Sequence, residues 1–412
     1  MKVGIISINA HTKVLNFASP LHTYAFQQFL TREGIDNIII DYKPCYMKAF
    51  DVRHPYDWHV EHPDADPEKQ AKLLAKWKTL YDDREKRFDR LQEFIDEKYV
   101  ATPVLYNQDL LDTEDPGCDI YMAVTDIIWK YNPVNGFDRG FLLNSKCMEG
   151  KGTIAYAASR GASKYTEEQN EQFRGYIQNI DYITAREKSL MKHVNDQQLT
   201  PASLVIDPIL LMDADFYRDM EIKPKEEKYV LCYTVMENKT GVLKAAFQYA
   251  QEHGLTLVDI SDDATILYDH EGLPRTTYYD IGVEEWLGFM DHAEVIFTNS
   301  FHCVCFSMLF HKDFYAGPRG GDKVTWILDL FEIKGRRLKK DGSLPNGKIN
   351  WERTDSRLAE YRGISRKYIL TAIKNLEFRQ NHPTLGKLRM KLIKPKGIEG
   401  AVAKHKEAAK KK

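Results

Sequence analysis

Short apolar runs alternate along this chain with longer amphipathic segments, and this alternation predicts the strands and helices of an α/β protein. The first run, at 3–8, is followed by a helical pattern with Ser19 as its cap and Pro20 as its first residue. Gly34 ends this helix, and a second apolar run follows at 37–42. Two apolar strands joined by a helix predict a βαβ unit with parallel strands.

The same alternation continues through the first half of the chain. A charged helical pattern covers 67–98, and another helix is predicted at 166–178. Apolar runs of strand length lie at 119–124, 153–158, 181–185 and 203–207. Strands and helices in this order predict a parallel sheet with helices on both faces.

A charged segment containing a proline, at 221–227, separates this half from a second half in which the pattern restarts. Strands are predicted at 229–235, 255–260, 294–299 and 313–317, and helices at 240–252, 283–293 and 322–331. We therefore expect two doubly wound, Rossmann-like α/β domains facing a cleft, as in the GT-B fold. The predicted units are a first domain at 1–220, a second at 228–355, helices at 356–376 that can return to the first domain, and a tail at 381–412.

Length and composition agree with a two-domain globular protein. A chain of 412 residues exceeds what one hydrophobic core usually supports, and 43% of its residues are hydrophobic. No apolar run approaches the ~20 residues needed to span a bilayer, and the opening run is too short for a signal peptide. Six scattered cysteines form no disulfide framework, so we expect a reducing, cytoplasmic setting.

Two cysteines raise the question of a metal site. Cys303 and Cys305 are two positions apart on a predicted helix, where side chains point in different directions, and structural zinc sites usually draw on CxxC pairs. We expect both to be packed side chains and predict no metal. There is no P-loop or GxGxxG motif, so no nucleotide cofactor is predicted. An acidic body without a basic, aromatic face argues against nucleic-acid binding.

Charge is distributed unevenly along the chain. Residues 381–412 hold ten lysine or arginine residues against two glutamates, a net charge of +8, whereas the whole chain has a formal net charge of −2. Two interpretations stay open for this segment. One is a solvated, flexible tail, which the lack of aromatic anchors favours; the other is peripheral contact with an anionic membrane surface, at the inner face of the membrane.

Polar residues follow the apolar runs at several strand ends, the edge at which open α/β sheets bind ligands. These residues are Asp126, Ser159, Arg160, Arg186 and His302, and Lys323 begins a later helix. His302 lies where a strand meets a helix start, beside backbone N–H groups that favour anions. The strand ends therefore predict an anion site that contains a proton donor.

Five short blocks of sequence carry a further signal. They are NFASPLHTYAFQQFL at 16–30, VTDIIW at 124–129, IAYAASRG at 154–161, DYITAREKSL at 181–190, and TNSFH at 298–302 followed by FSMLFHKDF at 306–314. In these blocks and their order the chain resembles the polysaccharide pyruvyl transferase family. The resemblance spans roughly residues 1–376.

The resemblance implies a transferase that moves a pyruvyl group from phosphoenolpyruvate to two hydroxyls of a saccharide, forming a cyclic ketal in cell-surface polysaccharide synthesis. Arg186, His302 and Lys323 match the arginine, histidine and lysine implicated in that family. A guanidinium can bind a carboxylate or phosphate with two parallel hydrogen bonds, and a lysine adds a point charge. An imidazole can deliver a proton to the methylene carbon.

The expected binding residues around this set are Ser300, Arg160, Ser159, Asp126 and Asn16. Three of them have a structural alternative: Asp126 can cap a helix or turn, Ser300 can begin the turn, and Arg160 can be a solvated loop charge. The expected partners are phosphoenolpyruvate and a saccharide acceptor, and whether a lipid carries that acceptor is left open. No cofactor is predicted.

The chain also departs from the family pattern. Ala18, Val124 and Cys303 stand where the family has glycine, which lets backbone approach a ligand closely. Two alternatives therefore remain beside pyruvyl transfer. One is a sialyltransferase-like GT-B enzyme that uses a nucleotide sugar, and the other is a catalytically silent scaffold relative.

Overall fold

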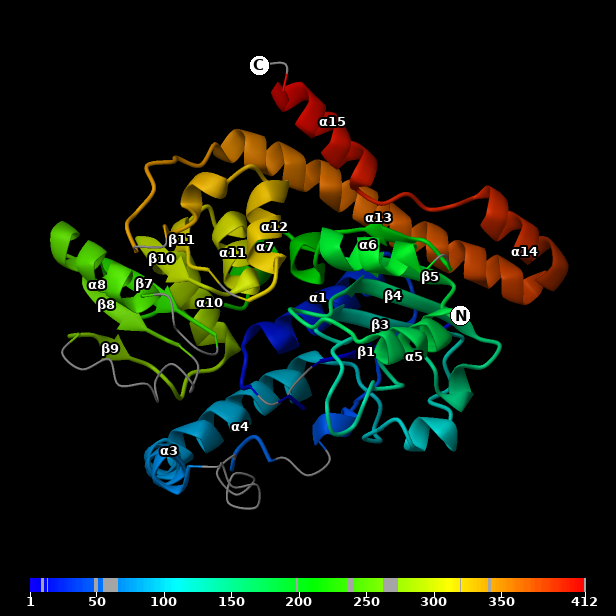
Figure 1. Ribbon diagram of the computed structural model, residues 1–412, viewed down its shortest axis with the longest axis horizontal. Helices are drawn as coiled ribbons and strands as arrows, with labels where there is room; N and C mark the ends of the chain where they lie inside the picture. The colour runs from blue at the N-terminus through cyan, green and yellow to red at the C-terminus, as the bar shows by residue number, and fades with distance from the viewer. Residues whose placement is uncertain are drawn as a thin grey trace.

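A computed structural model of the chain describes residues 1–8, 11–12, 14–47, 51–54, 66–197, 199–235, 241–261, 273–318, 320–339 and 342–410. Two parallel sheets form the two lobes (Figure 1). The first sheet has the order β2-β1-β3-β4-β5-β6, and the second has the order β11-β10-β7-β8-β9. All neighbouring strands pair in parallel. The prediction of two doubly wound α/β domains is confirmed.

The strands lie close to the predicted apolar runs. In the first sheet they are β1 (Val3–Ser7), β2 (Asn37–Ile39), β3 (Ile120–Asp126), β4 (Gly152–Ala158), β5 (Tyr182–Ala185) and β6 (Ala202–Leu204). In the second they are β7 (Tyr229–Tyr233), β8 (Thr256–Asp259), β9 (Thr276–Thr277), β10 (Val295–Thr298) and β11 (Asp313–Ala316). The two-residue edge strand β9 was not predicted, because it is too short and too exposed to give an apolar pattern.

The helices of the first lobe are α1 (Ala18–Arg32), α3 (Pro67–Thr79), α4 (Tyr81–Lys98), α5 (Glu167–Ile177), α6 (Lys188–Asp196) and α7 (Ala214–Arg218). Those of the second lobe are α8 (Val242–His253), α10 (Val283–His292), α11 (Phe301–Leu309) and α12 (Lys323–Leu330). The prediction that Ser19 caps the first helix was wrong. The helix begins at Ala18, because Asn16 Oδ1 accepts a hydrogen bond from the Ala18 N–H at 2.9 Å.

Alternate residues of the first sheet pack into two different cores. Ile5 and Met122 face α1 and α13, whereas Ile6 and Tyr121 face α5 and α6. The second sheet is arranged in the same way, with α8 on one face and α10, α11 and α12 on the other. The inner faces of both sheets share one continuous core.

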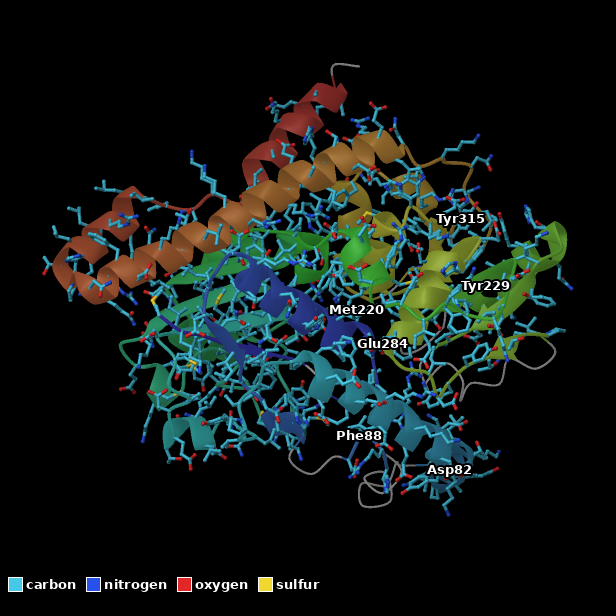
Figure 2. All side chains as sticks on the ribbon, turned by 180° about the vertical axis from the view of Figure 1, so that it is seen from behind. Asp82, Phe88, Met220, Tyr229, Glu284 and Tyr315 are labelled. Atoms are coloured by element: carbon cyan, nitrogen blue, oxygen red, sulfur yellow. The ribbon has the colours of Figure 1, made fainter. Side chains whose placement is uncertain are left out.

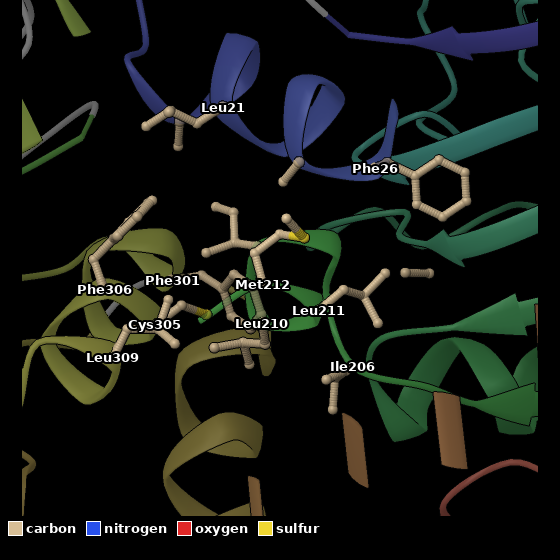
Figure 3. Close-up of a cluster of buried hydrophobic side chains, with 14 of the residues drawn as sticks. Leu21, Phe26, Ile206, Leu210, Leu211, Met212, Phe301, Cys305, Phe306 and Leu309 are labelled. Carbon is tan, nitrogen blue, oxygen red and sulfur yellow. The ribbon is translucent and has the colours of Figure 1, made fainter. Parts of the chain in front are cut away.

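The 3-10 helix η4 (Pro208–Leu211) lies in the middle of this shared core and packs against α1, α11 and α13. Figure 3 shows Leu210 and Leu211 of this turn in one cluster with Leu21 of α1 and Phe306 of α11. The lobes are therefore joined by apolar packing. A second bridge links α4 to α10, where Arg90 pairs with Glu285, and Figure 2 shows Phe88 and Glu284 near this junction.

The C-terminal segment is helical: α13 (Trp351–Asn381), α14 (Pro383–Leu392) and α15 (Glu399–Lys410). Helix α13 runs along both lobes (Figures 1 and 2), and its Arg362 donates to the carbonyls of Leu210 and Met212. Among the described residues, none of the helices combines the length and apolarity that crossing a membrane requires.

The expectation of a flexible tail from 381 was wrong for the residues up to 410, and 411–412 lie outside the described residues. Ile398 is fully buried and Val402 nearly so, and Glu399 accepts a hydrogen bond from the Leu204 N–H at 2.5 Å. High positive charge does not prevent ordering where apolar residues at helical spacing reach a core.

Candidate active site

A cavity of about 260 Å³ opens at the carboxyl ends of β3 and β10, between the two lobes. Its lining includes the polar residues Thr12, Asn16, Ser19, Tyr46, Asp126, Lys130, Asn132, Ser300, His302 and Lys323. The apolar residues Ile8, Val14, Ile127, Val235 and Phe301 complete it. Residues from both lobes thus meet at the sheet edge where α/β proteins bind ligands.

The end of β3 has an unusual backbone. Thr125 and Asp126 have φ angles of 43° and 61°, in the left-handed region that residues other than glycine rarely adopt. The Thr125 hydroxyl donates to Asp207 Oδ2 at 2.9 Å, and Asp126 accepts from Arg186 at 2.7 Å. Such strained backbone persists where surrounding contacts fix it, and here those contacts belong to the site.

Arg186 lies directly behind the cavity and is almost completely buried. Its Nη1 is 2.8 Å from Asp207 Oδ2 and 3.1 Å from His302 Nε2, and its Nη2 is 2.7 Å from Asp126 Oδ1. The guanidinium also lies 4.6 Å from the centre of the Phe301 ring. Two carboxylates and an aromatic face therefore surround a cation that follows β5.

Electrostatics keep this cluster charged. Burial alone would raise the pKa of Asp126 and Asp207, but the Arg186 guanidinium beside both carboxylates and the His302 ring beside Asp207 hold these pKa values well below the usual carboxyl range. Burial disfavours the charged form of Arg186, but Asp126 and Asp207 outweigh this effect and raise its pKa above the usual arginine value. One guanidinium and two carboxylates thus form a fixed buried network.

His302 connects this network to the cavity. Its ring lines the cavity, while Nε2 faces Arg186 at 3.1 Å and Asp207 Oδ2 at 3.6 Å. A guanidinium can only donate, so a neutral imidazole accepts from Arg186 at Nε2, and the Asp207 carboxylate faces the same nitrogen at a longer distance. The structure records no hydrogen bond to Nδ1 from any residue it describes.

A second histidine lies beside the first. His22 of α1 is fully buried, and its ring centre is 5.6 Å from that of His302. Its Nδ1 is 3.2 Å from Thr23 Oγ1, whereas its buried Nε2 has no hydrogen-bond partner in the described structure. Burial and the neighbouring His302 lower the pKa of His22 to about 3, so this ring is neutral at pH 7.

Glu187 and Lys323 are two further buried ionisable residues near the site. Burial raises the pKa of Glu187 to about 7, although Arg186 and Lys323 act in the opposite direction. Neither Glu187 oxygen lies within hydrogen-bond geometry of a described residue, and Arg186 Nε is 3.7 Å from Oε2. Lys323 begins α12 and lines the cavity.

The structure brings five of the predicted site residues to one cavity: His302, Lys323, Ser300, Asp126 and Asn16. Ser300 also caps α11 by accepting from the Cys303 N–H at 3.4 Å.

Three predicted residues do not line the cavity. Ser159 is buried and accepts from the Gly161 N–H, and Arg160 lies 5.4 Å from the Tyr165 ring centre. Arg186 is the third, because Asp126 and Asp207 occupy the guanidinium that we expected to bind the ligand directly.

The three positions that lack the family glycine have ordinary backbone. Ala18, Val124 and Cys303 are not among the described residues with positive φ, so their conformations do not require glycine. All three are buried, and Cys303 Sγ lies 3.4 Å from Met290 Sδ of α10. The extra side chains therefore occupy core space and do not enter the lining of the cavity.

Sequence reasoning missed Asp207, His22, Glu187 and Lys130. Asp207 ends the predicted strand 203–207, at the same edge where the predicted site residues follow their strands, so the same rule could have found it. His22 lies inside a helix, and nothing in its sequence neighbourhood separates it from an ordinary core residue.

Comparisons with known proteins identify a family. The family model described as polysaccharide pyruvyl transferase matches residues 21–316, well over half of the chain. No curated protein matches the chain.

Solved structures resemble it only distantly. UDP-N-acetylglucosamine 2-epimerase from Rickettsia bellii has 10% identity and a TM-score of 0.45, covering 92% of this chain and 98% of its own. The Methanocaldococcus jannaschii UDP-GlcNAc 2-epimerase in complex with UDP-GlcNAc and UDP has 12% identity and a TM-score of 0.40, covering 88% and 100%. Anabaena HepE in complex with UDP-glucose has 10% identity and a TM-score of 0.45, covering 92% and 99%. The family match covers Asp126, Arg186 and His302, and the chain belongs to the polysaccharide pyruvyl transferase family.

Proposed function

We propose that this protein binds phosphoenolpyruvate in the cavity and transfers its pyruvyl group to two hydroxyls of a saccharide. The observation that carries the proposal is the placement of His302, whose ring lines the cavity while its Nε2 contacts a buried Arg186–Asp207 pair. Family membership supports a transferase of this kind.

The charges at the cavity suit a small anion. Phosphoenolpyruvate carries a carboxylate and a phosphate, and Lys130 and Lys323 are the two permanent cations of the lining. The first N–H groups of α11, at Phe301 and His302, have no acceptor within their own helix and lie at the same wall. These groups are proposed to hold the phosphate and the carboxylate.

His302 is proposed to be the acid that protonates the methylene carbon. As an imidazolium it can keep Nε2–H toward Asp207 and present the Nδ1 hydrogen to the cavity. Protonation makes the central carbon electrophilic, and one sugar hydroxyl adds to it. The C–O bond to phosphate then breaks, and the second hydroxyl closes the ketal. One hydroxyl hydrogen replaces the proton given to the methyl group, and the other leaves with phosphate.

Arg186 is proposed to position His302. Its Nη1 donates toward Nε2 when the imidazole is neutral, and its salt bridges hold Asp207 beside the ring. The arginine therefore acts through the histidine, since its own hydrogen bonds are directed at protein groups.

The size of the cavity favours phosphoenolpyruvate over a nucleotide sugar. At about 260 Å³ it lies below the ~300–1,000 Å³ typical of sites for larger ligands. Thermal shift with phosphoenolpyruvate, CMP-sugars and UDP-sugars separates these donors, because a ligand at 100 times its Kd stabilises by about 2.7 kcal/mol. Stabilisation by a nucleotide sugar alone would contradict the proposal, and stabilisation by neither donor would favour the silent scaffold.

The decisive measurement is phosphate release from phosphoenolpyruvate in the presence of a panel of hexose acceptors. His302→Ala is expected to lower the rate at least about 100-fold, the usual contribution of a general acid. The matched control is His311→Ala, because His311 lies just beyond the same helix, is exposed and pairs with Asp355. A rate in His302→Ala equal to that of the wild type would overturn the mechanism.

A further inference from the structure

We propose that α14 docks the protein onto an anionic lipid surface through a ridge formed by Leu385, Leu388 and Leu392. This inference rests on the outer face of one helix and is independent of the proposed transfer reaction. The side chains of the ridge are 59%, 53% and 75% exposed. Their spacing of three and four residues places them along one side of the helix.

The opposite side of α14 is fixed to the protein, so the ridge has a defined orientation. A side chain at Gly386 would lie 2.3 Å from the Cα of Arg379, which shows how closely α14 approaches α13. Arg389 donates to Asn375 Oδ1 at 3.0 Å, and Asn375 in turn donates to the Ile393 carbonyl at 2.7 Å. Because α14 packs against α13 through this side, the leucines on the opposite side stay exposed to solvent.

The ridge is a concentration of exposed apolar surface. Ten large apolar residues are exposed in the described part of the chain, and four of them lie within 385–393, Ile393 being the fourth. Single exposed leucines need no explanation, whereas several on one helix face mark an interaction site.

Positive charge surrounds the ridge. Lys387, Lys391, Lys394 and Lys396 are all exposed, and no acidic residue occurs between Glu377 and Glu399. Lys387 also lines a polar groove of about 980 Å³ in which five basic residues meet three acidic ones, Asp112, Glu149 and Asp181. Leucines beside lysines on a surface helix are typical of interfacial helices that bind anionic lipids.

This charge selects the partner. A second copy of the chain would bring like charges together across the ridge, which disfavours a symmetric dimer. A lipid surface with anionic headgroups complements both the ridge and the lysines around it. The leucines enter the acyl boundary, and the lysines meet the headgroups.

The test is co-sedimentation of the full chain with vesicles of pure phosphatidylcholine, and with vesicles of phosphatidylcholine and phosphatidylglycerol in equal parts. We expect binding only to the anionic vesicles, weakened by added salt. Leu385→Ser with Leu388→Ser and Leu392→Ser is expected to lower the partition coefficient at least about tenfold. The matched control is Val134→Ser with Ile222→Ser, two exposed apolar residues outside this helix.

A second set of variants tests the charge. Lys387→Gln with Lys391→Gln and Lys394→Gln is expected to cause a similar loss, whereas Lys223→Gln with Lys225→Gln and Lys244→Gln is not. These residues are exposed, so folding is not at risk, and the thermal shift with phosphoenolpyruvate should stay at the wild-type value. Equal binding to both vesicle types, unchanged binding of the serine variant, or a wild-type dimer in sedimentation that the serine variant abolishes would each overturn the proposal.

Discussion

Arg186 shows how the buried charges of the site depend on one another. Its guanidinium is shared between Asp126 and Asp207, and each carboxylate would be uncompensated without it. Removing one member of a buried ion pair typically costs about 3–5 kcal/mol of stability. Substitutions of Arg186 or Asp207 therefore perturb folding and catalysis together, and His302 is the better place to test chemistry.

His22 is expected to make the protein less stable as the medium becomes acidic. Its pKa is lowered from 6.5 to about 3 by burial and His302, so between these values the unfolded chain takes up a proton that the folded chain does not. In this window the free energy of unfolding should decrease as the pH is lowered, by up to about 1.4 kcal/mol per pH unit. His22→Asn should flatten this dependence in urea denaturation.

The control for this prediction is His193→Asn. Burial also lowers the pKa of His193, to about 4, so its contribution has the same sign and is unaffected by a change at His22. Parallel curves for the wild type and His22→Asn between about pH 4.5 and pH 6.5 would contradict the expected effect of burial.

Glu187 is expected to have the opposite effect. Burial raises its pKa from 4.5 to about 7, so the folded state holds a proton that the unfolded chain has already lost. The stability it contributes is complete below pH 4.5 and is lost as the pH rises through 7. Glu187→Gln cannot ionise, so its stability relative to the wild type should increase from pH 5 to pH 7.5 in the same denaturation series. A difference that is constant or decreases with pH would show that the carboxyl is ionised throughout.

The strand-end rule found much of the site from sequence, and its misses have a physical cause. His302, Asp126 and Lys323 could be placed near one cavity because parallel strands deliver their carboxyl ends to one edge. The burial of Arg186 could not be foreseen, since it depends on the pairing with Asp207, which lies 21 residues further along the chain. Tertiary packing decides which charged side chains pair with each other and which line the cavity. The order of residues along the chain does not specify this packing.

The order of helix α14 could not be predicted from the sequence. Its residues were expected to be a flexible tail because charge dominates their composition. The contacts that order the segment involve a glycine, an arginine and an asparagine, none of which gives an apolar pattern. By contrast, strands such as β3 and β4 were predictable because they are buried on both faces and read as continuous apolar runs.

Gly386→Ala is expected to detach α14. The added Cβ would lie 2.3 Å from the Arg379 Cα, which is backbone and cannot move aside easily. Overpacking of this kind costs about 1–3 kcal/mol, and at the end of the chain the cost should appear as local opening. Hydrogen exchange should accelerate in α14 while the sheets keep their protection.

Gly400→Ala is the matched control. Gly400 lies in α15, and a Cβ there meets nothing within 4 Å. Alanine at this position should be neutral or stabilise the helix by about 0.5–1 kcal/mol. Unchanged exchange in Gly386→Ala would mean that α14 does not dock through this contact.

At the scale of the whole molecule, the continuous core predicts that the two lobes unfold together. Residues of η4, α11, α13 and the inner faces of both sheets belong to one cluster. Figure 3 shows the part of this cluster that α1, η4 and α11 form. Lobes joined in this way hold Asp126 and Lys323 at a fixed separation, so the cavity is already formed before a ligand binds. An architecture with an open cleft and mobile domains would give two separate stabilities.

Leu243→Ala tests this coupling. Leu243 is fully buried between α8 and the outer face of the second sheet, far from the first sheet in the packing. Its truncation should cost about 2–5 kcal/mol, equivalent to a roughly 30- to 5,000-fold faster exchange of amides that open only on global unfolding. If the molecule is one cooperative unit, the slowest amides of β3 should accelerate by the same factor as those of β7. Acceleration confined to β7, β8 and β10 would show that the lobes unfold independently, and closure of the cavity around its ligand would then be the better description.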